Sequence, residues 1–249
     1  MTPALETVAL VKRFGGVAAT QGVSLRLDAG ARHALIGPNG AGKTTLVDQL
    51  AGALRPDAGR ILLGGVDVTR LGPARRARMG LGRTFQISQM FPRLTVAESI
   101  AVAVAERLRR GGDAWGGRAA RAAIAAETAA IVDRLGLGDV AERPSATLPY
   151  GRQRQLDIAV ALAGSPRVLL LDEPAAGVPE ADRRALLATL DALPAEVAIL
   201  LIDHDMDLVF SFARRISVLV AGQILAEGPP ARIAADPRVR AVYLGDADG

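Results

Sequence analysis

The stretch Gly37-Pro38-Asn39-Gly40-Ala41-Gly42-Lys43-Thr44-Thr45 decides the fold of this 249-residue chain. It directly follows an apolar run at residues 34–36, so it is typical of a strand, a tight loop and a helix start. The glycines let several backbone N–H groups point at one anion, and a helix beginning near Lys43 adds its positive dipole end. Lys43 supplies charge to outer phosphates, and Thr44 offers a hydroxyl to Mg²⁺. A full nine-residue match favours a phosphate-binding loop over a chance glycine-rich turn.

The composition limits the remaining classes. Half of the residues are hydrophobic, which suits one large or two small domains, and no apolar stretch approaches the roughly 18 residues that cross a bilayer. The start lacks a secretory pattern, and we expect a cytoplasmic chain. Cysteine is absent, which excludes disulfides and thiolate metal sites. The 30 basic residues are interspersed with 26 acidic ones, which leaves a net charge of +4, and aromatic residues make up 3% of the chain. We therefore expect no nucleic-acid partner.

Strand and helix patterns alternate along the chain and predict an α/β fold. We expect strands at 5–11, 23–28, 31–36, 59–63, 66–68, 168–171, 197–202 and 216–220, and helices at 44–54, 73–79, 151–163, 180–192 and 205–213. An alanine-rich helical stretch runs from 96 to about 135, with a glycine break at 111–117. The pattern predicts a mostly parallel sheet covered by helices on both faces. A β-rich opening and an inserted helical part complete the expectation.

The second strong motif is the apolar run 168–171 followed by Asp172, Glu173 and Pro174. A buried strand of this kind ends in carboxylates that can face the phosphate loop. Asp172 there can hold Mg²⁺, and Glu173 can polarise the attacking water. An ordinary solvated strand end is the alternative, and the preceding phosphate loop makes it the weaker one.

Between these motifs lies Leu148-Pro149-Tyr150-Gly151-Arg152-Gln153-Arg154-Gln155. With it, the whole chain resembles the ATP-binding subunit of an ABC transporter, a P-loop NTPase core with an antiparallel β subdomain and a helical subdomain. The resemblance implies a single ABC ATPase domain over 1–249. Its core would span 1–90 and 165–245, and its helical signature subdomain about 91–164.

The resemblance also assigns roles residue by residue. Phe14 matches the aromatic that stacks on adenine, and residues 37–45 bind the phosphates of ATP. Gln86 matches the glutamine that reaches Mg²⁺ and the attacking water, and His204 the histidine that contacts the γ-phosphate. Taken alone, Phe14 is as well explained by core packing, and His204 is as well explained by a structural role. For His33, a structural role is the single interpretation. The family signature falls on Leu148, Pro149, Tyr150, Gly151 and Arg152.

Finer features are similar to the branch that energises high-affinity uptake of branched-chain amino acids. These are residues 80–86, 148–151, 174–177 and the tail 236–245. Related systems carry urea, organic acids or lipopolysaccharide. Pro149 replaces the signature serine and removes its hydroxyl, Tyr150 replaces a glycine, and Arg152 replaces a glutamine and adds a cation. Pro179 stands where many relatives have aspartate or asparagine, so communication between subunits is the property these departures affect.

The resemblance implies a head-to-tail pair with itself or a paralogue, with MgATP between the two chains. It also implies permease partners, an indirect solute-binding protein and a place on the cytoplasmic face of the membrane. A soluble ABC-type ATPase acting on DNA or ribosomes is the rival, disfavoured by the modest helical insert and the single ATPase motif set. A nucleotide sensor without turnover is disfavoured because Glu173 and His204 are both present.

Overall fold

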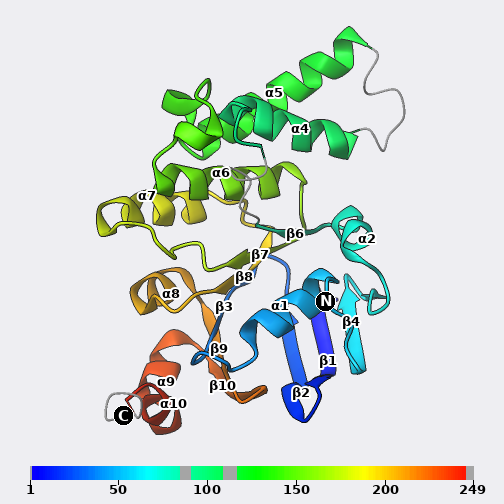
Figure 1. The fold of residues 1–249 in the computed structure, drawn as a ribbon, viewed down its shortest axis with the longest axis vertical. Coiled ribbons are helices and arrows are strands. Elements are labelled where there is room, and N and C mark those ends of the chain that lie inside the picture. Colours follow the sequence, from blue (N-terminus) through cyan, green and yellow to red (C-terminus); the bar gives the residue numbers. More distant parts are fainter. Residues whose placement is uncertain (1, 85–90, 109–116, 245–249) are drawn as a thin grey trace.

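The structure is a computed structural model that describes residues 2–84, 91–108 and 117–244 (Figure 1). An antiparallel sheet of order β2-β1-β4-β5 contains β1 (Leu5–Phe14), β2 (Val17–Leu27), β4 (Ala58–Leu63) and β5 (Val66–Asp67). A six-stranded sheet of order β10-β9-β3-β8-β7-β6 contains β3 (Arg32–Ile36), β6 (Leu81–Arg83), β7 (Val168–Asp172), β8 (Ala198–Ile202), β9 (Arg215–Val220) and β10 (Gln223–Gly228). Strands β6, β7, β8, β3 and β9 run parallel, and β10 joins β9 antiparallel at the edge.

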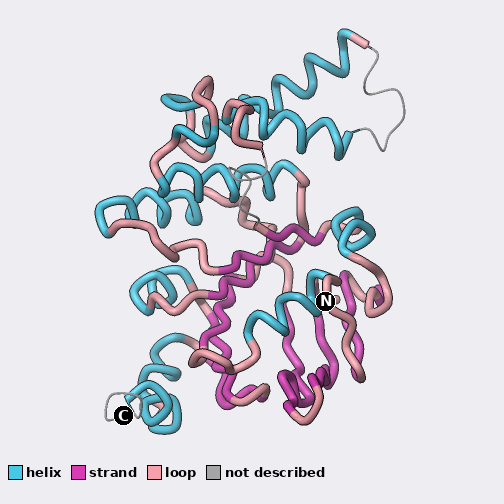
Figure 2. The backbone as a smooth tube through the Cα atoms, in the orientation of Figure 1, coloured by secondary structure: helices cyan, strands magenta, loops and turns pink. Residues whose placement is uncertain are grey.

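Helices lie on both sides of the larger sheet, and a further group of helices lies away from it at one end of the molecule (Figure 2). They are α1 (Lys43–Ala51), α2 (Pro73–Arg78), α4 (Val96–Leu108), α5 (Arg118–Arg134), α6 (Tyr150–Ala163), α7 (Glu180–Asp191), α8 (Met206–Phe212), α9 (Pro230–Ala235) and α10 (Pro237–Leu244), with short 3-10 turns at Gly138–Val140 and Ser145–Thr147. In Figure 1, α4 and α5 lie at one end of the molecule and α9 and α10 at the other.

Strand β7 shows why the larger sheet needs cover on both faces. Its residues 168–171 are fully buried, as expected for a parallel strand between two layers. Because side chains alternate along a strand, Leu169 and Leu171 join the core under the helices α4 to α9. Val168 and Leu170 join a second core with α1 and the antiparallel sheet. Two apolar layers thus hold the end of β7 in place.

The predicted α/β fold, with its antiparallel and helical parts, is confirmed. Three boundaries differ by three residues or more. The hairpin closes on Gly15 and Gly16, so β1 extends to Phe14 and β2 begins at Val17. Helix α1 ends at Ala51 rather than residue 54, because Gly52 turns left-handed with φ of 82°.

The strands β6 and β10 and the helices α9 and α10 lie outside the predicted elements. They are short, with three to eight residues each, and carry little periodicity. The break predicted at 111–117 falls mainly on residues outside the described ranges.

Candidate functional site

The predicted phosphate-binding loop joins β3 to α1. Gly42 precedes α1 with φ of 101°, and a Cβ there would lie 2.1 Å from the carbonyl oxygen of Ala19. Only glycine fits this turn without strain. Nζ of Lys43 donates hydrogen bonds to the carbonyl oxygens of Gly37 and Pro38, at 2.6 and 2.9 Å. The ammonium therefore lies folded over the loop.

A cavity of about 500 Å³ opens beside this loop, at the edge where the parallel strands end. Ligands of open α/β sheets bind at this edge. The cavity is lined by Thr44, Arg83, Thr84, Arg154, Asp172, Glu173 and Ala176. The structure thus brings the predicted residues Thr44, Asp172 and Glu173 into one cavity, although Thr44 and Asp172 lie 128 positions apart in the sequence.

The backbone of Glu173 is strained. Its φ is 47°, a left-handed conformation that costs a non-glycine residue free energy, and its N–H donates to the carbonyl oxygen of Ile202 at 2.7 Å. Such strain persists where surrounding structure fixes it, and it collects at functional sites. The Glu173 side chain at this bend is about half exposed.

The Lys43 ammonium and the Glu173 carboxylate act on each other across this site. Burial is the larger influence and lowers the pKa of Lys43, while the negative charge of Glu173 opposes that shift. Loss of hydration disfavours the charged amine, and a nearby anion favours it. Triphosphate, which carries more negative charge than Glu173, would favour the charged lysine further.

His204 and Glu173 approach each other from neighbouring strands. Nδ1 of His204 lies 3.9 Å from Oε1 of Glu173, and the histidine side chain is largely exposed. The exposure argues against the alternative of a buried structural histidine. His33, in contrast, is buried, and its Nε2 lies 2.8 Å from Oγ of Ser217.

A residue that the sequence analysis did not single out supports both loops. The fully buried carboxylate of Asp203 accepts hydrogen bonds from the backbone N–H groups of His204, Asp205 and Ala175, at 2.8, 3.0 and 3.1 Å. It therefore ties the turn after Glu173 to the turn that carries His204. Its place beside His204, directly after a buried strand, was the available signal.

Arg83 is a second missed residue. Its guanidinium donates to Oδ1 of Asp48 at 2.6 Å and to Oδ2 of Asp172 at 2.9 Å. It stands in the quoted run 80–86, but the two partners are distant in sequence. Gln86, predicted to reach Mg²⁺ and water, lies outside the described residues.

The signature residues surround the start of α6. Leu148 is buried, Pro149 precedes the helix with φ of −55°, and no side chain caps the first turn. Tyr150 pairs with Arg154, whose guanidinium carbon lies 4.8 Å from the ring centre. A Cβ on Gly177 would lie 3.1 Å from that ring, so the tyrosine also packs on the loop after Glu173.

The guanidinium of Arg152 is bound by groups of its own chain. It donates to the carbonyl oxygen of Gly136 at 2.8 Å, to Asp139 at 2.9 Å and to Gln155 at 3.1 Å. These contacts hold the guanidinium against the helical part. The cation that Arg152 adds to the signature is thus paired with groups of its own chain.

Phe14 ends β1 with 52% of its surface exposed, and Nζ of Lys12 lies 5.7 Å from its ring centre. An aromatic so exposed is not a core residue, which removes the alternative weighed from the sequence. Pro179 immediately precedes α7 and accepts a hydrogen bond from the N–H of Asp182 at 2.9 Å. Proline suits that position because the φ that its ring imposes, about −65°, is close to the observed −56°.

Comparison with known proteins identifies the family of the chain. The family model described as ABC transporter matches residues 20–176, and one described as branched-chain amino acid ATP-binding cassette transporter matches residues 223–249. The chain is 38% identical to the high-affinity branched-chain amino acid transport ATP-binding protein BraF of Pseudomonas aeruginosa, over 98% of this chain and 99% of that protein. It is 39% identical to LivG of Escherichia coli strain K12, a protein with the same description, over 98% and 99% of the two chains.

A solved structure shares the fold. It is the ADP conformation of an ATP-binding cassette of an ABC transporter, with a TM-score of 0.83, 28% identity, and coverage of 98% of this chain and 100% of that one. These findings confirm the predicted family, the resemblance to the branched-chain amino acid branch and the ATP hydrolase class. The chain belongs to the ABC transporter family, as an ATP-binding protein of that family.

Proposed function

We propose that the chain hydrolyses MgATP as one half of a head-to-tail pair and thereby drives uptake of branched-chain or related amino acids through permease partners. The observation that carries the proposal is the convergence of Lys43, Thr44, Asp172, Glu173 and His204 at one edge of the sheet. The descriptions of BraF and LivG support the transport class and the amino-acid cargo.

Nucleotide binding follows from the loop. The amides of residues 37–45 and the start of α1 would hold the phosphates, and the Lys43 ammonium would leave its carbonyl partners for the outer phosphates. The exposed ring of Phe14 would stack on adenine.

The residues present suit Mg²⁺. Thr44 and Asp172 line one cavity, and within the described ranges no hydrogen bond is recorded to Oδ1 of Asp172. No group of three or more His, Cys, Asp or Glu side chains forms a self-contained metal site among these residues. Mg²⁺ typically uses one or two protein ligands, with phosphates and water completing its shell. The ion would neutralise phosphate charge, and Gln86 is its third proposed ligand.

Glu173 would accept the proton of the attacking water, since its strained backbone holds it beside the cavity. His204, from the neighbouring strand, would contact the γ-phosphate. Asp203 acts on both through the backbone, because it fixes the turns that carry them.

A second subunit would complete the site. None of the residues 148–152 lines the cavity that contains Thr44 and Glu173. The first turn of α6 has no side-chain cap, so its N–H groups remain suited to an anion. We therefore expect the 148–152 segment of one chain to face ATP bound to the other. ATP would close the pair, and hydrolysis would release it.

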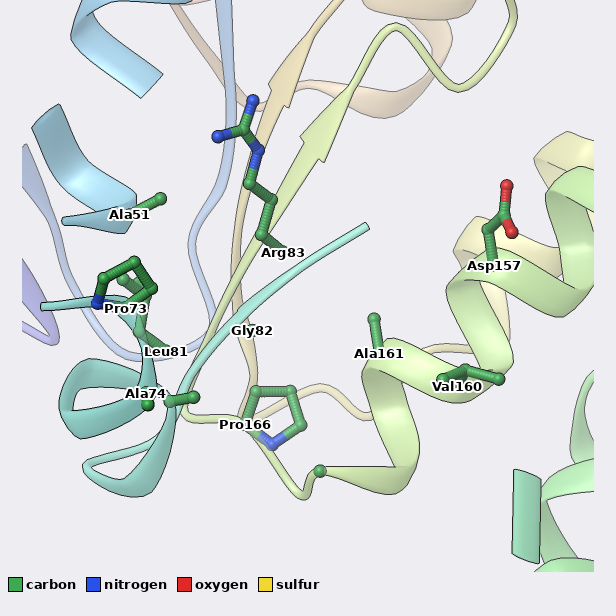
Figure 3. A pocket seen from close by; sticks show the side chains of 12 residues that line it. Ala51, Pro73, Ala74, Leu81, Gly82, Arg83, Asp157, Val160, Ala161 and Pro166 are labelled. Atoms are coloured by element: carbon green, nitrogen blue, oxygen red, sulfur yellow. The ribbon is translucent and has the colours of Figure 1, made fainter. Parts of the chain in front are cut away.

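A groove beside the site suits the permease. Figure 3 shows it between α2, β6 and α6, with Pro73, Leu81, Ala161 and Pro166 around it. Its volume is about 330 Å³, and its lining is mostly apolar. It adjoins Arg83, from which the chain leads to Gln86, the segment that the family resemblance assigns to the transmembrane partner.

The proposal puts the subunit on the cytoplasmic face of the membrane. Within the described residues, no helix combines the length and apolar character needed to span a bilayer. Cargo selection would lie in the permeases and a solute-binding protein. ATPases of urea, organic-acid or lipopolysaccharide systems are the alternatives, followed by a soluble ABC ATPase.

The test is uptake in the native cell. Deletion of the gene is expected to abolish uptake of radiolabelled leucine, wild-type protein to restore it, and Lys43→Ala to fail at equal expression. Unlabelled isoleucine, valine, urea and dicarboxylates added as competitors would identify the cargo class. Leucine uptake unchanged by the deletion would refute the amino-acid assignment. Copurification with ribosomes or DNA-repair factors in place of permeases would refute the transport assignment.

A further inference from the structure

Arg83 connects three elements of the nucleotide site, β6, α1 and β7, through two ion pairs. It ends β6, and its guanidinium reaches Asp48 of α1 and Asp172 of β7 at 2.6 and 2.9 Å. Asp48 lies four residues after Thr44 in the same helix, so the two side chains share one face of α1. With 17% of its side chain exposed, Arg83 is well enclosed.

The geometry of Asp172 is what makes this contact informative. Oδ2 is engaged by Nη2 of Arg83, whereas no hydrogen bond to Oδ1 is recorded within the described part of the chain. A carboxylate held through one oxygen presents the other in a fixed direction. Groups that hydrogen-bond a metal ligand in this way orient it, and their loss typically lowers metal affinity about 10- to 100-fold.

We propose that Arg83 is a positioning residue for the Mg²⁺ site: it orients Asp172 toward the bound ion and keeps α1 at a fixed distance from β7. The proposal rests on the proposed MgATP hydrolysis. Arg83 itself binds neither ion nor nucleotide, because its two terminal nitrogens are already turned to Asp48 and Asp172. It acts by fixing the carboxylate that does.

Charge supports the same role. Asp48 and Asp172 share one guanidinium, and Glu173 adds a third carboxylate beside the cavity. Without the arginine, the like charges of Asp48 and Asp172 would repel each other. Lysine would keep the charge, but its single ammonium lacks the planar fork that bridges two carboxylates.

The direction of the side chain agrees. Figure 3 shows the Arg83 guanidinium pointing away from Pro166, which lies at the far side of the groove of α2, β6 and α6. Among the described residues that line this groove and the catalytic cavity, Arg83 is the one they share. The guanidinium reaches Asp48 and Asp172 on the site's side of the residue.

The experiment measures metal-dependent nucleotide binding without turnover. A fluorescent, non-hydrolysable ATP analogue is titrated onto the purified full chain, first in EDTA and then at rising Mg²⁺. The variants are Arg83→Gln and Arg83→Lys. The matched control is Arg78→Gln on α2, an exposed arginine that forms no ion pair with any residue of the described ranges. Mn²⁺ in place of Mg²⁺, followed by electron paramagnetic resonance, gives an independent measure of the ion.

Arg83→Gln is expected to bind the analogue in EDTA within twofold of wild type, and to need at least tenfold more Mg²⁺ for half-saturation. Arg83→Lys is expected to fall between, and Arg78→Gln to match wild type. A merely structural ion pair would lower the melting temperature and leave the Mg²⁺ midpoint within twofold, which would overturn the inference. If Arg83→Gln does not fold, the same criterion applies to Arg83→Lys.

Failure of the proposed function gives a different result. Wild-type chain whose analogue binding is indifferent to Mg²⁺ would refute the MgATP assignment, and the inference with it. Wild-type chain with a clear Mg²⁺ midpoint that Arg83→Gln leaves unmoved would refute the role of Arg83 alone.

Discussion

The turn that carries Glu173 is expected to depend on Asp203, although that residue does not touch the cavity. The change Asp203→Asn tests this dependence with nearly unchanged volume. Oδ1 accepts two backbone N–H groups, from His204 and Asp205, and Oδ2 accepts the N–H of Ala175. An amide has one oxygen, so it can replace one of these acceptors, and its NH₂ group would face a backbone donor.

The cost follows from this count. The variant loses at least one hydrogen bond to a charged acceptor, which contributes about 1.5–3 kcal/mol, and leaves the buried N–H of Ala175 without a partner. We expect the free energy of unfolding to fall by about 2–3 kcal/mol. Since the turn after Glu173 loosens while the phosphate loop is untouched, kcat should fall and the Kd for ATP should stay within twofold.

Urea denaturation of the nucleotide-free chain, followed by circular dichroism, measures the free energy of unfolding. Phosphate release measures kcat. Asp207→Asn is the control, because Asp207 is exposed in the first turn of α8, and we expect a loss below about 0.5 kcal/mol. A loss of that small size in Asp203→Asn, or kcat equal to wild type, would refute the reasoning.

Two further predictions concern acid stability and pairing. Burial lowers the pKa of His33 to about 4, so the unfolded chain takes up a proton first; stability is complete above about pH 6.5 and decreases by up to about 3 kcal/mol toward pH 4. Urea midpoints at pH 7 and 4.5 should differ less in His33→Gln than in the wild type. An equal difference would contradict the assignment of this acid-dependent loss of stability to His33. Pro149→Ser restores a hydroxyl worth about 1.5–3 kcal/mol as a bond to phosphate, so ATP-dependent pairing should tighten about tenfold or more by sedimentation. Unchanged or weaker pairing would mean that the site is built around proline.

The phosphate-binding loop and the strand before Asp172 were predictable because each contains all of its defining residues in one short stretch of sequence. The loop 37–45 carries its own glycines, its lysine and the helix start, and the apolar run before Asp172 needs no distant partner to be identified as a buried strand. The structure adds the cavity in which Thr44, Asp172 and Glu173 meet.

What the sequence did not reveal are contacts between distant elements. Arg83 and Asp172 are 89 residues apart, and their pairing follows from the register in which Arg83 lies beside Leu170. The role of Asp203 depends on the turn after Glu173, in a different strand connection. The partners of Arg152 lie in the turn after α5 and within α6, which composition alone does not indicate.

The most direct test of the account is the change Glu173→Gln, which keeps the side-chain shape and removes the base. Sedimentation with MgATP measures the pairing of the chains, and phosphate release measures hydrolysis. The account predicts that ATP binds, that hydrolysis stalls and that a stable pair accumulates only in the variant. Phosphate release at the wild-type rate, or an ATP-bound variant that remains a single chain, would contradict it.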